Sequence, residues 1–339
     1  MDNLTHSLVG AVLGQAGLKR TTGLAMPALI IGANLPDVDA ACFVWLEGTE
    51  HLAFRRGITH GPPALVLLPL VLAGILWGWD RWQTRCGKRP EARLPVRFGW
   101  LYAMAFIGCL SHPFFDWLNV YGIRLLEPFS SAWFYGDTLF IIDPWLWALL
   151  IGAVWWSRRR EKAAAEWTRP ARVGIAAVLA YIGVNGAITV LNYETRGTRR
   201  EPYPETYVAA PVPLAFWRRE QVALLHDGRW ISSDWDGADF GHGYAHSQAT
   251  QCKLPDLAEE RRTTSQLDAF LFWSRAPFAV RAEDGSVILY DARFYDPRAR
   301  GRFAVALPDV RCEELHERVT LKQVEDDGVG VETPTQGNQ

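Results

Sequence analysis

The sequence predicts an α-helical polytopic membrane domain followed by a small β-rich (α+β) soluble domain. Up to about residue 194, long uncharged apolar stretches are separated by short basic clusters. Beyond that point charges, prolines and short alternating runs follow one another, although the mean hydropathy of the whole chain is only −0.03. Averaging therefore hides two regions, one suited to lipid and one to water. We expect a membrane domain at 1–193, a linker at 194–213, a soluble domain at 214–324 and a disordered tail at 325–339.

The overall charge excludes one class of partner. A formal net charge of −2 and an isoelectric point near 6.5 provide no basic field over the chain. Nucleic-acid binding depends on such a field. Nucleic acid is therefore not an expected partner. The long apolar stretches make the lipid bilayer the partner that we expect.

Four uncharged or nearly uncharged runs predict membrane-spanning helices. Residues 61–79 and 173–193 are long enough to cross about 30 Å of hydrocarbon. Residues 98–111 form a shorter run that ends at His112, and residues 138–157 contain Asp143. We predict spans at all four.

The first apolar segment, residues 4–34, carries Lys19 and Arg20 in its middle. Two charges at that position are too costly for the centre of one span. We predict a tight hairpin of two short helices instead.

Basic residues predict the orientation. Loops 80–97 and 158–172 each carry six Lys or Arg residues, against Arg55 and Arg56 on the other side. Because loops rich in Lys and Arg stay in the cytoplasm, everything after residue 194 is expected outside it.

This threading gathers imidazoles and carboxylates on one face of the membrane. They are His6, Asp37, Asp39, His60, His112, Asp116 and, inside the next apolar run, Asp143. Such groups bind Zn²⁺, and also Mn²⁺ or Fe²⁺, and a bound cation offsets the cost of carboxylates beside lipid. The pattern predicts a divalent metal centre, with Zn²⁺ the first expectation.

Simpler interpretations of these residues stay open. Asp37 and Asp39 follow Pro36, and turn and cap residues have the same pattern. Asp143 precedes Pro144 and could be the N-cap of a helix. His112 and Asp116 are four apart, so they share a face of a helix that we expect to begin near residue 111, with Pro113 in its first turn.

Four ordered motifs carry a family resemblance. They are MDNLTH at 1–6, LPDVD at 35–39, RGITH at 56–60 and SHPFFDWLN at 111–119 followed by Tyr121-Gly122. The region 1–190 resembles the membrane-bound, metal-dependent hydrolases of the YdjM family. The resemblance implies an inner-membrane protein of bacteria or archaea, with a metal site distantly similar to the zinc phospholipase C and P1 nuclease group. It also implies that the histidines and aspartates of these motifs are the site residues.

One position departs from the family pattern. Arg55 stands where the family commonly has a histidine, so one ligand position has no match.

These residues predict an integral-membrane hydrolase that cleaves a phosphoester or other ester of an amphiphilic substrate, a phosphorylated one in the first instance. A metal lowers the pKa of a bound water and polarises the substrate. Asp39 or Asp116 is the predicted base, and Arg56 the predicted phosphate or oxyanion contact, although a contact with lipid headgroups fits Arg56 equally.

Two other classes of function were weighed. A non-catalytic membrane scaffold, with a structural metal and a partner-binding outer domain, is the alternative. A transporter is disfavoured because runs 61–79 and 173–193 contain no ionisable group near their middle.

In the C-terminal region, alternating runs bounded by turn residues predict strands. These runs are 217–225, 269–273, 278–282, 286–290 and 302–307, after a Pro- and Tyr-rich linker or leading strand. Cys252 and Cys312 are the two cysteines there and could pair in an oxidising compartment. His242 and His246 are interpreted as residues of a surface loop rather than as a second metal site.

Overall fold

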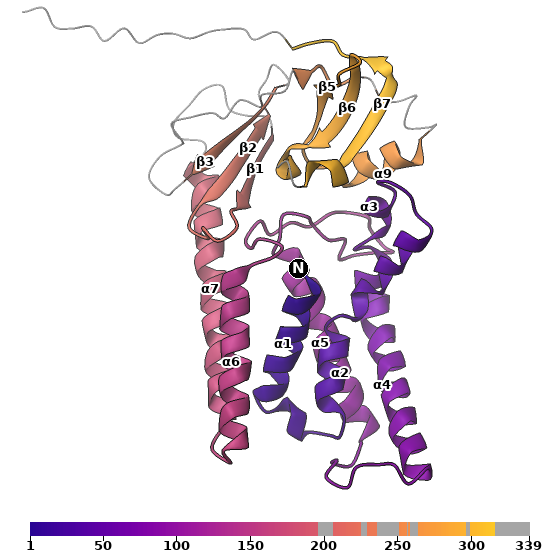
Figure 1. The fold of residues 1–339 in the computed structure, drawn as a ribbon, viewed down its shortest axis with the longest axis vertical. Helices are drawn as coiled ribbons and strands as arrows, with labels where there is room; N and C mark the ends of the chain where they lie inside the picture. The colour runs from indigo at the N-terminus through magenta and orange to yellow at the C-terminus, as the bar shows by residue number, and fades with distance from the viewer. Residues whose placement is uncertain are drawn as a thin grey trace, which may run out of the picture.

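In a computed structural model of the protein, a bundle of helices stands under two small antiparallel sheets (Figure 1). The structure describes residues 1–195, 206–224, 229–235, 251–255, 257, 264–295 and 299–315. The predicted succession of a helical region and a β-rich region is confirmed. His242, His246 and the tail 325–339 lie outside the described residues.

The chain starts with two short helices. Helix α1 (Asn3–Gln15) is capped by Asp2, whose side chain accepts from the Leu4 and Thr5 amides, and α2 is Ala25–Gly32. The 3₁₀ turn η1 (Leu18–Arg20) between them carries Lys19 and Arg20. The predicted hairpin is therefore confirmed. Three short helical turns follow: η2 (Leu35–Val44), α3 (His51–Phe54) and η3 (Ile58–His60).

Among the described residues, three helices are long and apolar enough to span a membrane: α4 (Pro62–Arg85), α5 (Phe98–Trp117) and α7 (Thr168–Thr195). Helix α2 and the turn η2, bent by 50°, make a fourth candidate as a broken or re-entrant span. The fourth predicted span, 138–157, needs correction. Its helix, α6, covers Pro144–Lys162 and is not among the candidate spans. Asp143 caps the helix and Pro144 is its first residue, so the apolar part starts later than predicted, and the last turn is strongly basic.

Helix α5 corrects a second prediction. It passes through Pro113 as one helix and does not begin near residue 111. A proline inside a helix removes one backbone hydrogen bond, which membrane helices tolerate where neighbouring groups compensate. The continuous helix still places His112 and Asp116 on one face, as predicted.

Glycines let α1, α2 and α5 approach closely. A Cβ at Gly10 would lie 2.6 Å from the Leu29 carbonyl oxygen, and one at Gly108 would lie 2.4 Å from the same atom. A Cβ at Gly32 would lie 2.6 Å from the Ala105 carbonyl oxygen. Small residues at such crossings allow backbones to pack in direct contact. These contacts hold together the three helices that surround the candidate site.

Two sheets form the outer part. The strands β1 (Thr206–Pro211), β2 (Arg219–Leu224) and β3 (Trp230–Trp235) make one, in that order. The other has the order β4 (Gln251–Cys252), β5 (Pro277–Arg281), β6 (Ser286–Asp291) and β7 (Ala304–Arg311), with the 3₁₀ turns η4 (Ala292–Phe294) and η5 (Arg300–Arg302) between the last two. Cys252 and Cys312 form a disulfide, with their Cα atoms 5.3 Å apart.

The run 269–273 was predicted to be a strand, and this is wrong. It belongs to helix α9 (Ser265–Trp273), in which Leu267, Phe270 and Trp273 fall three residues apart and are buried together. Five residues were too short a window to separate period two from period three.

The outer part packs on the loops that follow α2 and α5. Leu52 of α3 is buried in one hydrophobic cluster with Leu267, Phe270 and Trp273 of α9. Thr49 donates to the carbonyl of Gln266 at 2.7 Å. The β-rich part therefore lies directly over the segments that carry the candidate site residues (Figure 1).

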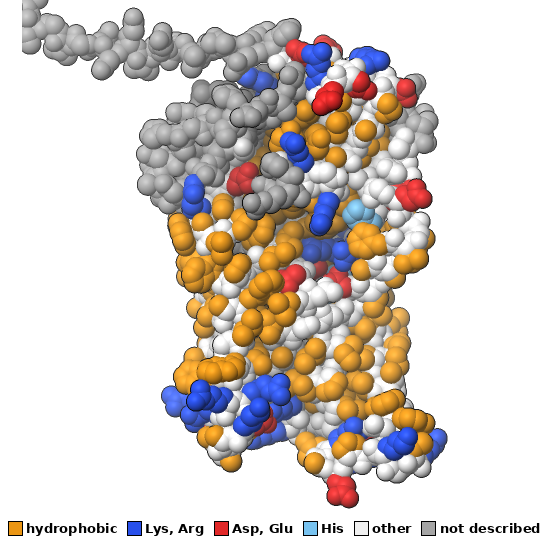
Figure 2. Space-filling model, in the orientation of Figure 1, with side chains coloured by type: hydrophobic (Ala, Val, Ile, Leu, Met, Phe, Trp, Pro, Cys, Tyr) orange, Lys and Arg blue, Asp and Glu red, His pale blue; other side chains and the backbone are white. Residues whose placement is uncertain are grey.

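Basic side chains mark the opposite end of the bundle. Figure 2 shows Lys and Arg gathered away from the strands, with hydrophobic side chains over the helices between the two ends. Members of this basic end are Lys19, Arg20, Arg85, Arg159, Arg160 and Lys162. Aromatic side chains stack on several of them: Lys19 and Arg20 lie over Trp167, and Arg159 lies over Trp155. This is the arrangement expected at a bilayer surface.

Native Cys86 tests the predicted sidedness. It is an exposed free cysteine directly after α4, at the basic end, whereas Cys42 and Cys109 are buried. On intact cells, a membrane-impermeant maleimide should label Cys86 only after the membrane is permeabilised. A Cys86→Ser chain carrying Glu283→Cys, at an exposed position of the outer part, should label at once. The reverse pattern would contradict the predicted orientation.

Candidate metal centre

Four elements bring the predicted residues together near the end of the bundle that faces the strands. Helix α1 supplies His6, η2 supplies Asp37, η3 supplies His60, and α5 supplies His112 and Asp116. The three histidines and Asp116 have none of their surface exposed. Two groups of residues each offer three donor atoms that lie within 4.8 Å of one another. The first group is His6, Asp37 and His112, and the second is His60, His112 and Asp116. Because His112 belongs to both, they make one site.

The Nε2 atoms of His60 and His112 face each other. Their Nε2 atoms are 3.2 Å apart. Nδ1 of His112 lies 2.8 Å from the Ala33 carbonyl oxygen, which can only accept, so the proton of this ring is on Nδ1. In the neutral ring, Nε2 of His112 then carries the lone pair.

The same argument applies to His60. Its Nδ1 lies 2.9 Å from the hydroxyl oxygen of Thr59, and that hydroxyl donates to Asp39 Oδ2. The hydroxyl oxygen therefore accepts from Nδ1, and Nε2 of His60 is also unprotonated. Burial lowers the pKa of His60 well below its ordinary value, and neighbouring His112 acts in the same direction. Two lone pairs at 3.2 Å repel each other unless a cation or a proton lies between them.

His6 completes the group of imidazoles. Its ring stacks on that of His112, with centroids 3.8 Å apart and planes at 17°. Neither of its ring nitrogens makes a well-aligned hydrogen bond within the described residues, although Nε2 lies 3.3 Å from Asp116 Oδ1. A buried polar group without a partner is costly, so such groups mark places that bind something else.

Asp116 lies at the centre of the site. Its Oδ1 contacts the nitrogen of Met1, and its Oδ2 lies 3.5 Å from His112 Nε2 and 3.7 Å from His60 Nε2. Oδ2 has no aligned hydrogen bond from the described part of the chain, although Arg56 Nε forms an ion pair with it at 3.0 Å. This oxygen therefore faces the two imidazole lone pairs.

Arg56 is fully engaged by the protein itself. Besides Asp116, its guanidinium donates to Asn119 Oδ1 and the Gly122 carbonyl, both at 3.1 Å, and it lies 4.5 Å from the ring centre of Tyr121. Its backbone is left-handed, with φ of 55°. These contacts make Arg56 a positioning residue for Asp116; the predicted contact with substrate stays a prediction.

Asp39 and Asp37 have different surroundings. Asp39 Oδ2 accepts from the Arg56 amide at 2.8 Å and from the Thr59 hydroxyl. Because the Thr59 hydroxyl also contacts Nδ1 of His60, Asp39 orients the His60 ring through Thr59. Asp39 belongs to neither set of donor atoms. Asp37 Oδ1 accepts from Arg55 Nη2 at 2.8 Å and lies 3.8 Å from His112 Nε2. Arg55, at the position that departs from the family pattern, thus balances both carboxylates.

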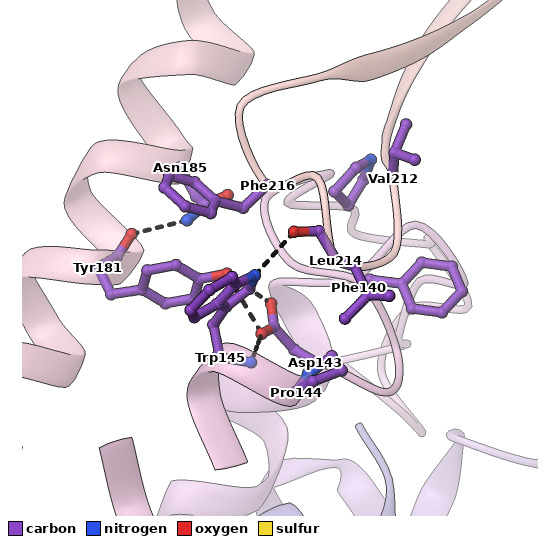
Figure 3. A pocket seen from close by; sticks show the side chains of 10 residues that line it. Phe140, Asp143, Pro144, Trp145, Tyr181, Asn185, Val212, Leu214 and Phe216 are labelled. Atoms are coloured by element: carbon purple, nitrogen blue, oxygen red, sulfur yellow. Dashed lines mark hydrogen bonds between the residues drawn. The ribbon is translucent and has the colours of Figure 1, made fainter. Parts of the chain in front are cut away.

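Asp143 belongs to neither set of donor atoms. Figure 3 shows it at the start of α6, where its carboxylate accepts from the Trp145 and Leu146 amides and from the Tyr181 hydroxyl. The capping interpretation of Asp143 is therefore the one that its contacts describe.

Sequence reasoning missed several supporting groups. Tyr121 lies under Arg56 and against Trp273 of α9, and Arg293 of η4 donates to the Val120 carbonyl at 2.8 Å. Nothing in the spacing of these residues signals a contact with the site, because each depends on how the outer part packs on the bundle. Asn119 lay within a quoted motif, which was the one available signal.

A comparison with family models decides the identity of the helical region. The model described as YdjM inner membrane protein matches residues 1–191, more than half of the chain. The chain belongs to the YdjM family. It is an integral membrane protein, in agreement with its three candidate spans. No curated protein and no solved structure matches the chain.

The donor set of this YdjM family member fits a divalent cation. Tetrahedral Zn²⁺ with bonds of about 2.05 Å separates its ligand atoms by roughly 3.3 Å. The distances among His60 Nε2, His112 Nε2 and Asp116 Oδ2 are 3.2, 3.5 and 3.7 Å. Three imidazoles and two carboxylates are ligands suited to Zn²⁺ and also to Mn²⁺ or Fe²⁺. Ala33 and the Thr59–Asp39 pair orient two of these rings, as outer partners do around metals.

Proposed function

We propose that this YdjM family member is a metal-dependent hydrolase of the membrane, acting on a phosphoester or other ester of an amphiphilic substrate. One observation supports it above the others. The Nε2 lone pairs of His60 and His112 face each other at 3.2 Å, with Asp116 Oδ2 beside them, in a site without exposed surface. His6, His60, His112, Asp116 and Asp37 are the residues that would hold the cation.

A divalent cation held by these residues would supply a water of lowered pKa and would polarise a phosphoryl or acyl oxygen. A carboxylate must then take up the proton. Asp39 and Asp116 have their oxygens engaged by Arg56, Thr59 and the imidazoles. Asp37 Oδ2 accepts no hydrogen bond within the described chain, and 9% of this side chain is exposed. We assign the proton acceptor to Asp37 in place of Asp39 or Asp116.

The surroundings of the site support an amphiphilic substrate. Arg55 lies at its edge with 24% of its side chain exposed and 5.4 Å from the ring centre of Phe43. Large apolar side chains on η2, α3 and η3 are exposed beside it: Val38, Phe43, Val44, Trp45, Phe54 and Ile58. This exposed apolar surface matches the apolar chain of an amphiphilic substrate.

The test is hydrolysis by detergent-purified protein of a panel of long-chain phosphomonoesters, phosphodiesters and carboxylic esters in mixed micelles. A chelator should abolish turnover, and Zn²⁺, Mn²⁺ or Fe²⁺ should restore it to different degrees. Asp37→Asn should lower kcat by about 10²-fold or more while metal remains bound by the three histidines and Asp116, as expected for loss of a general base. His51→Ala, a histidine outside the site, should leave the rate unchanged.

One result would contradict the proposed hydrolase activity. If the metal stays bound and no member of the panel turns over, the proposed activity is wrong. The cation would then be structural, and the outer part would remain as a surface for a partner.

A further inference from the structure

A hollow of about 340 Å³ opens at the basic end of the bundle, where α6 turns into α7. It is far from the candidate metal centre, since it lies at the other end of these helices (Figure 1). Its lining residues are Trp156, Arg160, Glu166, Arg169, Pro170 and Val173. Nothing in the proposed function uses it.

The lining divides into an apolar half and a cationic half. Trp156 and Val173 have 55% and 57% of their surface exposed, on membrane-facing helices. Arg160 and Arg169 lie toward the turn between the helices, level with the other Lys and Arg residues of the basic end. The hollow therefore lies across the boundary between hydrocarbon and headgroups.

The one carboxylate in the lining is already in use. Glu166 Oε1 accepts from the amides of Thr168 and Arg169 and from the Thr168 hydroxyl, so it caps the start of α7. Its pKa is lowered by these hydrogen bonds, the Thr168 hydroxyl first. These hydrogen bonds hold the carboxylate at the start of α7, in the wall of the hollow.

The two arginines retain donors for a ligand. Arg160 donates from Nε to the Glu166 carbonyl at 2.5 Å, and this contact fixes the side chain while leaving both terminal nitrogens. The side chain of Arg169 makes no hydrogen bond or ion pair within the described residues. Two guanidinium groups beside the apolar half of the hollow can bind a phosphate through bidentate hydrogen bonds, which the planar guanidinium favours.

We propose that this hollow binds an anionic phospholipid of the leaflet at the basic end. Arg160 and Arg169 hold its phosphate, and an acyl chain lies along Trp156 and Val173. The volume suits a headgroup, and basic pockets between membrane helices are a recognised way of holding anionic lipids.

The experiment measures lipid binding to the full chain in dodecyl maltoside by native mass spectrometry. Dioleoyl phosphatidylglycerol is titrated against dioleoyl phosphatidylcholine, and glycerol 3-phosphate serves as a headgroup without chains. Phosphatidylglycerol should bind tightest. Arg160→Gln with Arg169→Gln should weaken it by roughly five-fold for each arginine.

The matched control is Arg158→Gln with Arg159→Gln, which removes the same charge from exposed positions of α6, in the turn that carries Arg160. It should change the affinity by less than about two-fold. Equal weakening by both pairs would mean diffuse attraction and would overturn the site. Equal binding of glycerol 3-phosphate would overturn the lipid assignment, and both pairs should melt within about 2 °C of the wild type, as surface substitutions do.

Discussion

Replacing His112 with alanine is expected to reduce the bound divalent cation from about one per chain to background. His112 is the residue shared by both sets of donor atoms, and its Nε2 lies within 3.8 Å of Asp37, Asp116 and His60 donor atoms. No other ligand can replace it without moving α5. The measurement is metal quantification of detergent-purified protein after washing with a weak chelator.

The control for this variant is His51→Ala. His51 is a histidine of α3 that bonds to the Gly48 carbonyl and belongs to neither set of donor atoms. It should retain the full metal content. Equal metal content in wild type and His112→Ala would show that any cation is bound elsewhere.

Replacing Arg56 with methionine is expected to destabilise the metal-stripped protein by about 3–5 kcal/mol. Arg56 is the arginine paired with the fully buried Asp116, and without it this carboxylate keeps only the Met1 nitrogen as a cationic partner. The free energy of unfolding, measured by denaturing-detergent titration in mixed micelles, should show this loss.

Two further variants separate the cause. Arg55→Met removes a neighbouring arginine with 24% of its side chain exposed, and it should cost less than about 1 kcal/mol. Arg56→Met combined with Asp116→Leu should be more stable than Arg56→Met alone, because the carboxylate that has lost its guanidinium partner is then gone. If the double variant is the less stable of the two, burial of an unpaired charge is not the reason.

Much of the membrane region could be predicted because lipid imposes simple rules. Uninterrupted apolar length identified α4 and α7, and Lys19 and Arg20 identified the hairpin of α1 and α2. Errors arose where local chemistry competed with length. Pro113 suggested a helix start, yet α5 continues through it, and the fourth predicted span begins only at Pro144 because Asp143 caps it.

The candidate site could be predicted as a set of residues but not as an arrangement. The motifs named His6, Asp37, His60, His112 and Asp116, which the fold does bring together. The role of each residue within the site could not be predicted, because it depends on which carboxylate oxygen accepts from which donor. Asp39 supports His60 from behind, and Arg56 is held between Asp116 and Tyr121.

X-ray absorption at the metal edge of purified, metal-loaded protein tests the central claim most directly. The arrangement of His60, His112 and Asp116 predicts nitrogen and oxygen ligands at about 2.0–2.1 Å for Zn²⁺, with the outer scattering of imidazole rings. Loss of that imidazole signal in His60→Ala would assign it to this site. A spectrum of sulfur ligands at about 2.3 Å, or folded protein that takes up no metal, would contradict the account.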